Sequence, residues 1–416
     1  ACDKLGLIVW SEIPIVDHIS MTNEFFQNSL YMMKEMILQN FNHPSVAMWG
    51  YMNEVFGYLD WFMKSAPEDE RSKLKRETAR LARQLDSLAR ATDPQRLTVI
   101  AMHTDPYPQY YKESGLLDIA MINGWNVYQG WYHNNLDSLG KTLDYLYSLQ
   151  PAKPIFLSEY GAESDPRINT YEPTIFDNSS QYQEKFNERY LAEGNKRDYM
   201  AGFAIWNLID FQREGRSDAV RAMNSKGMVT TDRKPKNVYY LNQAHWSPVP
   251  MIKIAAEFWN RRTEISDSAY IIRPVTVYTN TSTAELFCNG KTLGKKNSVD
   301  NKIIWMVPFK SGHNDLMAVS DNLQDFASVE MTVIPETLSS SEWESININV
   351  GQTRTFFTDD LTGEYWVNDR LYKPGSFGSQ GGTLYANWPD MKAWQGIRQG
   401  VNNNFNGTRN NPVYQT

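Results

Sequence analysis

The chain has 416 residues, of which 41% are hydrophobic and 13% aromatic, and its formal net charge is −7. It is too long for one ordinary domain, so we expect two or three. The sequence contains no basic block and no run of about 20 apolar residues, which argues against nucleic acid as a partner and against a membrane-spanning helix. Cys2 and Cys288 form neither a disulfide framework nor a metal motif.

Up to about residue 245, apolar strands alternate with amphipathic helices. The first helix carries apolar residues at three- and four-residue spacing, namely Phe26, Leu30, Met33 and Ile37. Apolar strands between such helices predict an α/β fold with a parallel sheet and helices outside. The predicted strands are residues 7–10, 46–51, 97–102, 119–122, 154–157 and 202–206. The predicted helices are residues 23–39, a long charged helix after residue 65, and residues 136–149 and 182–194.

Six strands do not distinguish an open sheet from an incomplete barrel. The first six residues read as the last turn of a helix, closed by Gly6. We therefore expect the natural chain to continue upstream. This favours a (β/α)8 TIM barrel over residues 1–246, in which the chain supplies strands three to eight and the first two units lie upstream.

The pattern changes beyond residue 246 to short alternating strands. These are predicted at residues 275–278, 284–288, 303–307, 315–320 and 327–333. Asn289-Gly290 lies between two of them and predicts a type I′ hairpin turn. We expect an all-β Ig-like sandwich over residues 247–337 and a further β-rich domain over residues 338–416.

Two acidic residues each end an apolar strand. Glu54 follows Val46-Ala47-Met48-Trp49-Gly50-Tyr51-Met52-Asn53, and Glu159 follows Pro154-Ile155-Phe156-Leu157-Ser158. A carboxylate at the end of a buried strand loses hydration and gains nothing from packing. The carboxyl ends of parallel strands meet at one face of a barrel, so the two acids predict a pair of opposed carboxylates that can cut a glycosidic bond. For either acid alone, the alternative is a surface or salt-bridged Glu.

The segments Asn42-His43-Pro44-Ser45 leading to Asn53-Glu54, and Ser158-Glu159-Tyr160-Gly161, resemble glycoside hydrolase family 2. This is the family of β-galactosidases, β-glucuronidases and β-mannosidases, and the similarity covers residues 1 to about 245. The resemblance implies that Glu54 is the acid/base at the end of strand four and Glu159 the nucleophile at the end of strand seven. A retaining enzyme of this type needs carboxyl groups about 5–5.5 Å apart, with Glu54 protonated at rest.

The resemblance also implies substrate-binding roles for other residues. Asn53 would bond the sugar 2-hydroxyl, Asn126 and Tyr128 would approach the nucleophile and the sugar, and Trp206 would floor the site at the end of strand eight. The structural alternative is a strand-end cap for Asn53, loop packing for Asn126 and Tyr128, and a core residue for Trp206. His103 and Glu12, which also end predicted strands, could face the pocket or be structural, whereas His43 reads as structural.

Asn224-Ser225-Lys226-Gly227 resembles the Asn-x-Lys pair with which the β-glucuronidase branch binds a uronic carboxylate. Lys226 offers a positive charge for that purpose. Because β-galactosidase members also carry this segment, it does not separate the two activities, and a turn with a solvated Lys226 is the alternative.

Residues 356–360 and 372–378 resemble the start of a malectin-like carbohydrate-binding domain. The family also has amino-terminal sandwiches and barrel strands one and two ahead of Leu7, which this sequence does not contain. We therefore expect the sequence to be a fragment, or a chain completed by another chain.

The preferred hypothesis is an exo-acting retaining β-glycosidase, namely a β-galactosidase, that acts on an oligosaccharide or polysaccharide. A β-glucuronidase, a hydrolase of algal galactans and a non-catalytic carbohydrate-binding protein are the alternatives. The chemistry needs no organic cofactor, and a bound Mg²⁺ or Na⁺ has no signature in the sequence. We expect a periplasmic or extracellular bacterial location, and a homo-oligomer is left open.

Overall fold

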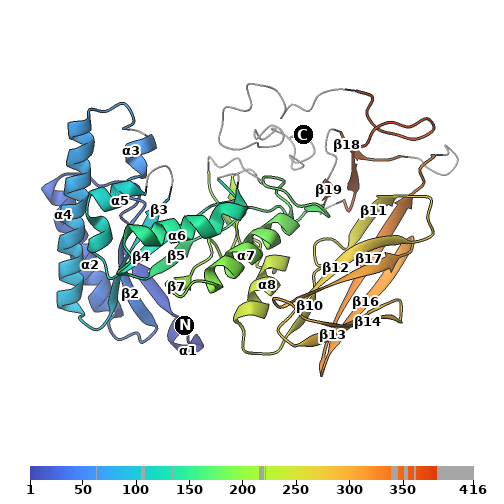
Figure 1. The fold of residues 1–416 in the computed structure, drawn as a ribbon, viewed down its shortest axis with the longest axis horizontal. Coiled ribbons are helices and arrows are strands. Elements are labelled where there is room, and N and C mark those ends of the chain that lie inside the picture. The colour runs from blue at the N-terminus through green and yellow to red at the C-terminus, as the bar shows by residue number, and fades with distance from the viewer. Residues whose placement is uncertain are drawn as a thin grey trace. The chain divides into compact units, whose positions relative to one another are not determined.

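In the computed structural model of the chain, the described residues are 1–61, 63–104, 108–132, 135–214, 220, 222–338, 345–350, 355–359 and 362–381. They divide into two compact units, shown in Figure 1. The first unit comprises residues 1–129, 137–160 and 190–205, and the second comprises residues 130–136, 161–189 and 206–416. The predictions for residues 339–344 and 382–416 lie outside the described residues.

The first unit is built on a six-stranded parallel sheet. Its strands are neighbours in chain order: β1 (Val9–Glu12), β2 (Val46–Asn53), β3 (Leu97–His103), β4 (Ile122–Asn126), β5 (Ile155–Glu159) and β7 (Met200–Phe203). Every neighbouring pair is parallel. Consecutive parallel strands joined by helices are the arrangement of a TIM barrel, so the predicted fold class is confirmed.

Helices precede and connect these strands. They are α1 (Cys2–Leu5), α2 (Asn23–Asn40), α3 (Gly57–Trp61), α4 (Glu68–Thr92), α5 (Gln109–Glu113), η1 (Leu116–Asp118), η2 (Leu136–Ser138), α6 (Leu139–Leu149) and α7 (Ser180–Asn195). α2 begins after Thr22, whose hydroxyl accepts a hydrogen bond from Phe25 N at 3.2 Å. The predicted face of α2 is confirmed, because Phe26, Met33 and Ile37 are buried. α2 and α4 lie side by side (Figure 1).

Glycines make room for a large side chain inside the sheet. A Cβ atom at Gly50 would lie 2.1 Å from Trp10 Nε1, and one at Gly124 would lie 2.7 Å from the Trp10 ring. Neither position can carry a side chain while Trp10 keeps its place. The glycines in β2 and β4 are therefore required by packing, although glycine is a poor strand former.

The second unit contains a β-sandwich with a buried core. One sheet has the order β11 (Arg261–Ile265), β17 (Leu323–Ile334), β16 (Gly312–Ser320), β13 (Thr283–Cys288) and β14 (Lys291–Asn297), and the other has the order β10 (Ile252–Ile254), β12 (Ile271–Thr279) and β15 (Lys302–Phe309). Their inward residues, such as Val277, Leu286 and Trp305, are buried together. Asn289 and Gly290 have φ values of 50° and 76°, which confirms the predicted turn between β13 and β14.

The remaining elements of the second unit include a small mixed sheet. It has the order β18 (Ile348–Asn349), β20 (Tyr365–Asn368), β19 (Thr355–Thr358) and β6 (Ile168–Thr170). β19 and β6 pair antiparallel, which joins the carboxyl-terminal section to the loop that follows β5 in the chain. β8 (Phe211–Gln212) pairs with β9 (Met223–Asn224), and helix α8 (Asn237–Trp246) ends where the sandwich segment begins.

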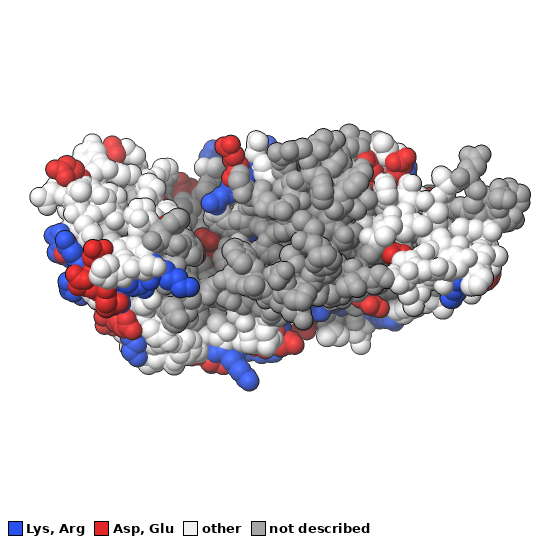
Figure 2. All heavy atoms as spheres, turned by 90° about the horizontal axis from the view of Figure 1, so that it is seen from above, with Lys and Arg blue, Asp and Glu red and all other residues white. Residues whose placement is uncertain are grey.

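The described surface carries charges of both signs. Where Figure 2 draws described residues, acidic and basic side chains are interspersed rather than gathered by sign. Across the described ranges, every helix is too short or too polar to cross a lipid bilayer.

Candidate active site

The carboxyl ends of β2, β3, β4 and β5 carry the predicted polar residues of the first unit. Asn53 and Glu159 are the last residues of β2 and β5, and His103 and Asn126 are the last residues of β3 and β4. Register pairs His103 with Asn126, and Asn126 with Glu159, across neighbouring strands. Parallel pairing thus brings side chains that are distant in sequence to one edge of the sheet.

Asn126 is the central residue of this cluster. Its side-chain amide donates to Glu54 Oε1 at 2.9 Å and to Asn53 Oδ1 at 3.0 Å, and its carbonyl oxygen accepts from Ser158 Oγ at 2.7 Å. Asn126 is only 1% exposed, so these bonds satisfy an amide that water does not reach. It therefore links the ends of β2 and β5 to its own strand.

Glu54 lies in a left-handed backbone conformation, with φ at 53°. This conformation costs a non-glycine residue about 1 kcal/mol or more. It is held by bonds from Glu54 N to Ala101 O at 3.0 Å and from Gly57 N to Glu54 O at 2.8 Å. The turn it makes directly after β2 brings the Glu54 carboxyl group to Asn126.

The environment of Glu54 favours the protonated acid. Burial raises its pKa above the ordinary value, the negative charge of Asp17 adds to this shift, and the hydrogen bond from Asn126 opposes it. Asp17 is fixed close to the end of β2, because its backbone N–H donates to Asn53 O at 3.0 Å. A carboxyl group whose pKa is raised is suited to act as a general acid.

Glu159 has a neutral partner. The Tyr128 hydroxyl donates to Glu159 Oε2 at 2.7 Å, and Val127 N donates to the Glu159 backbone carbonyl at 2.8 Å. A hydrogen bond from a phenol stabilises an ionised carboxylate. This places Tyr128 beside the predicted nucleophile, as expected. The 5–5.5 Å separation expected between the two carboxyl groups stays a prediction.

His103 and Glu12 have protein partners in the first unit. His103 is buried, its Nδ1 lies 2.7 Å from the Tyr111 hydroxyl, and burial lowers its pKa to about 4. Glu12 Oε2 accepts a hydrogen bond from Trp10 Nε1 at 3.0 Å, and burial raises the pKa of Glu12 to about 7. Both placements agree with the structural alternatives left open for these residues.

Trp206, Asn224 and Lys226 belong to the second unit. The expectation that Trp206 ends its strand is wrong, because β7 ends at Phe203. Beyond that end, Ala204 N donates to Leu157 O of the neighbouring strand β5 at 2.7 Å. Trp206 is half-buried, with its ring edge-to-face against Phe211. A Cβ at Gly161 would meet Trp206 O at 2.1 Å, so the Ser-Glu-Tyr-Gly segment requires its glycine.

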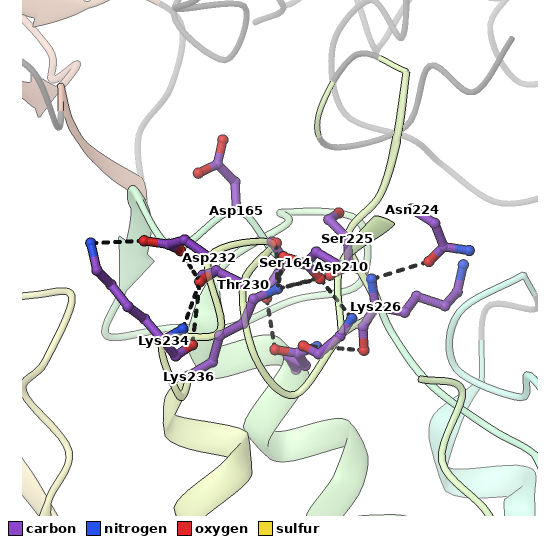
Figure 3. A network of polar contacts seen from close by, with 12 residues as sticks. Ser164, Asp165, Asp210, Asn224, Ser225, Lys226, Thr230, Asp232, Lys234 and Lys236 are labelled. Atoms are coloured by element: carbon purple, nitrogen blue, oxygen red, sulfur yellow. Dashed lines mark hydrogen bonds and ion pairs between the residues drawn. The ribbon is translucent and has the colours of Figure 1, made fainter. Parts of the chain in front are cut away.

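Lys226 is not a solvated turn residue. Its side chain is 1% exposed, and its ammonium lies 3.2 Å from Glu163 Oε1, whose side chain is 0% exposed, and 2.9 Å from the Tyr132 hydroxyl. Asn224 is buried beside it, and its side-chain oxygen accepts from Lys226 N at 3.3 Å (Figure 3). The structural alternative for this segment is therefore wrong, because a buried ammonium must have partners.

Sequence reasoning missed several residues of these two clusters: Asp17, Ser158, Tyr132, Glu163, Asp210 and Lys236. Tyr132, Ser158 and Asp210 could have been found, since Tyr132 lies shortly after Asn126, Ser158 directly precedes Glu159 in the quoted segment, and Asp210 is an acid that follows the last predicted strand. The others carry no local signal. Within the described part of the chain, no group of three or more His, Cys, Asp or Glu side chains is arranged to hold a metal ion.

A segment of parallel barrel with two acids at its strand ends is the arrangement of barrel-type glycoside hydrolases. Residues 1–251 match the family described as "Glycosyl hydrolases family 2, TIM barrel domain", and residues 272–322 match "Domain of unknown function (DUF4982)". The chain belongs to glycosyl hydrolase family 2. The predicted family is confirmed.

Several similar proteins are named β-glucuronidases, and one solved structure, 28% identical with a TM-score of 0.66 over 80% of this chain and 47% of that one, is named a putative β-galactosidase of Bacteroides fragilis. The chain is 29% identical, over 75% of its length, to a β-glucuronidase of Bacteroides fragilis, of which it covers 43%. It is 34% identical to the crystal structure of a Bacteroides uniformis β-glucuronidase, with a TM-score of 0.89, over 100% of this chain and 48% of that one. A second structure, B. uniformis β-glucuronidase 2 covalently bound to cyclophellitol-6-carboxylate aziridine, has 34% identity, a TM-score of 0.88 and the same coverage. The chain thus spans about half the length of these relatives.

Proposed function

We propose that this chain is the catalytic part of a retaining β-glucuronidase. The observation that carries the sugar assignment is Lys226, a buried ammonium in the Asn-x-Lys segment that resembles the carboxylate-binding pair of the glucuronidase branch. The relatives that are named β-glucuronidases support it, and one of them is covalently bound to a compound that carries a 6-carboxylate. These findings favour a glucuronide over the galactoside expected first, and a β-galactosidase becomes the second candidate.

The proposed reaction uses the strand-end residues in two steps. Glu159 attacks the anomeric carbon while Glu54 gives its proton to the leaving oxygen, which forms a glycosyl ester on Glu159 and releases the aglycone. Glu54, now ionised, takes a proton from water, and that water displaces Glu159 from the anomeric carbon. Two inversions give net retention. The hydrogen bond from Tyr128 orients Glu159 for the attack, and Asn126 orients Glu54.

The first experiment compares three aryl β-glycosides with one aglycone on the full-length protein. We expect the glucuronide to be turned over with a kcat/KM at least about 100-fold above that of the galactoside and the glucoside, because a site built for a charged group discriminates strongly against neutral analogues. A galactoside preference would instead support the second candidate, and no turnover of any of them would contradict the enzyme.

The second experiment tests Lys226 directly. Lys226→Met combined with Glu163→Gln removes both members of the buried pair, so neither charge is left unpaired. We expect a selective loss on the glucuronide with little change on the galactoside. An equal loss on both, in a protein whose melting temperature is unchanged, would contradict the role of Lys226.

Stereochemistry tests the retaining mechanism separately. Proton NMR of the first product should show the β-anomer of the released sugar. Initial α-anomer would contradict the assignment of Glu159 as nucleophile.

A periplasmic or extracellular location also stays a proposal.

A further inference from the structure

A second buried ion pair lies beside the segment that carries Lys226. The Lys236 ammonium is 2.9 Å from Asp210 Oδ2 and 3.0 Å from Asp210 Oδ1. The two side chains are 1% and 8% exposed. Figure 3 shows Lys236 and Asp210 pointing toward each other between the loops of the second unit.

This pair binds the backbone on both sides of Lys226. The Lys236 ammonium donates to the carbonyl oxygen of Ser225 at 3.0 Å, and Asp210 Oδ1 accepts from the backbone N–H of Gly227 at 2.7 Å. Ser225 and Gly227 are the two chain neighbours of Lys226. The ion pair therefore holds the backbone on both sides of Lys226, alongside Gln183, whose side-chain amide donates to Lys226 O at 3.2 Å.

The same pair also fixes the carboxylate that Lys226 contacts. The Lys236 ammonium lies 3.4 Å from both Ser164 O and Ser164 Oγ, and Ser164 N donates to Ser225 O at 3.2 Å. Ser164 directly follows Glu163, the partner of the Lys226 ammonium. The pair thus connects the segment of Lys226 with the segment of Glu163.

Stability alone does not account for two opposite charges buried here. Burial raises the pKa of Asp210 and lowers the pKa of Lys236, and the attraction between them opposes both shifts. A buried ion pair is often no more stabilising than apolar side chains of the same size, because both ions lose their hydration. What such a pair supplies is defined geometry, since every donor and acceptor needs a partner at a fixed place.

We propose that Asp210 and Lys236 are positioning residues that hold Lys226 in register for the carboxylate of the substrate. The proposal rests on the proposed function, because it assigns the positioning to the recognition of a uronic acid. A displacement of about 1 Å at a recognising group can cost about 100-fold in rate or affinity. The loss should fall on sugars with a carboxylate at C6 and should spare those with a hydroxymethyl group there.

The test uses the full-length protein with Asp210→Asn and Lys236→Met combined, so that no buried charge is left unpaired. We expect KM for an aryl β-glucuronide to rise about tenfold or more, with KM and kcat for the matching glucoside changed less than about threefold. Lys236→Arg is the second variant, because it keeps the ion pair but alters its geometry. It should show a smaller rise in KM that is again confined to the glucuronide. This variant keeps the test informative if the double variant does not fold.

The chain offers a matched control in the same segment. Asp232 and Lys234 form an ion pair at 3.0 Å, but their side chains are 57% and 67% exposed (Figure 3). Asp232→Asn with Lys234→Met should leave the ratio of glucuronide to glucoside turnover unchanged. If the Asp210 and Lys236 variants fold and lose neither substrate, or lose both equally, the positioning role is overturned.

A crystal structure of the double variant separates this inference from the proposed function. The wild-type substrate preference and the Lys226 variants report on the proposed function alone. The positioning role predicts that the Lys226 ammonium moves away from Glu163 Oε1, to which it lies at 3.2 Å in the wild type. A Lys226 that stays in place would overturn the inference whatever the substrate proves to be.

Discussion

The two polar clusters of this protein hold their carboxylates with different partners. At the strand ends of the first unit, Glu54 is bonded by the Asn126 amide and Glu159 by the Tyr128 phenol, both of which are neutral. In the second unit, Glu163 and Asp210 are bonded by the ammonium groups of Lys226 and Lys236. Glu54 and Glu159 are half-buried, whereas Glu163 and Asp210 are buried, so the ammonium partners accompany the carboxylates that water reaches least.

The difference suits the roles that we propose for these carboxylates. A neutral donor can stay bonded while the acid gains or loses a proton, so no unpaired charge is left behind in either state. An ammonium partner penalises protonation of the acid and fixes both charges in one arrangement. The partner of Glu54 therefore suits the proton transfer proposed for that residue, and the ammonium partners of the second cluster suit the holding of a fixed position.

Glu159→Gln should give the largest effect. If Glu159 is the nucleophile, kcat should fall by about 10⁴-fold or more, because the amide cannot form the covalent intermediate. Thermal unfolding should change little, since the amide keeps its size and can still accept from Tyr128. Activity within tenfold of the wild type would remove the strand-end cluster from the chemistry.

Asn126→Ala should reduce kcat by about 100-fold and also move the pH profile. The Asn126 bond lowers the pKa of Glu54, so its loss raises that pKa, and the basic limb of kcat/KM, where Glu54 must be protonated, moves to higher pH. The variant should also lose about 1–3 kcal/mol of stability, because Ser158 and Asn53 lose a buried partner. A pH–rate series with an aryl glycoside measures the shift, and a basic limb that does not move would contradict the assignment of Glu54.

Asp17→Asn should move the same limb in the opposite direction. Removing the negative charge of Asp17 lowers the pKa of Glu54, so activity should fall at a lower pH, by less than about one unit. Asp17 has φ at 65°, a conformation that Asn tolerates well, so the backbone is kept. Asp321→Asn, at another left-handed aspartate, serves as the control and should leave the limb in place.

Glu184→Gln extends the comparison to a third carboxyl group held by neutral donors. Asn237 donates to Glu184 Oε1 at 2.9 Å and the Tyr278 hydroxyl donates to Oε2, and burial raises the pKa of Glu184 to about 7. A folded-state pKa above the unfolded value means that stability is greatest at low pH and declines as pH rises from about 4.5 to about 7. The variant should lose this pH dependence, which amounts to about 1–3 kcal/mol in the free energy of unfolding. Chemical denaturation at pH 5 and pH 7 gives the free energy of unfolding at each pH. The same change between the two pH values in both proteins would contradict the pKa shift.

Local sequence predicted the fold best where apolar residues dominate. The strand predicted at residues 46–51 is β2, Val46–Asn53, whereas the strand predicted at 119–122 lies at Ile122–Asn126. The apolar residues ahead of β4 belong to a short helix and a turn rather than to a strand. β4 itself contains Gly124 and two asparagines, which are poor strand formers. Strand propensity therefore does not predict β4, because its residues serve the site and the packing against Trp10.

The site shows the same limit. Glu54, Glu159, Asn126 and Tyr128 could be predicted because family segments mark them. Lys236 could not, since it follows Arg233-Lys234-Pro235 and looks like part of a solvated basic run. Its burial depends on Asp210 and Ser225, which only the tertiary fold brings to it.

The antiparallel pairing of β19 with β6 has a practical consequence for engineering. A protein cut short ahead of residue 345 would leave Ile168–Thr170 as an uncovered sheet margin with unpaired N–H and C=O groups. Such margins recruit strands from other molecules. Shortened versions made for crystallisation or biocatalysis should therefore retain this carboxyl-terminal stretch, because it covers the edge of β6.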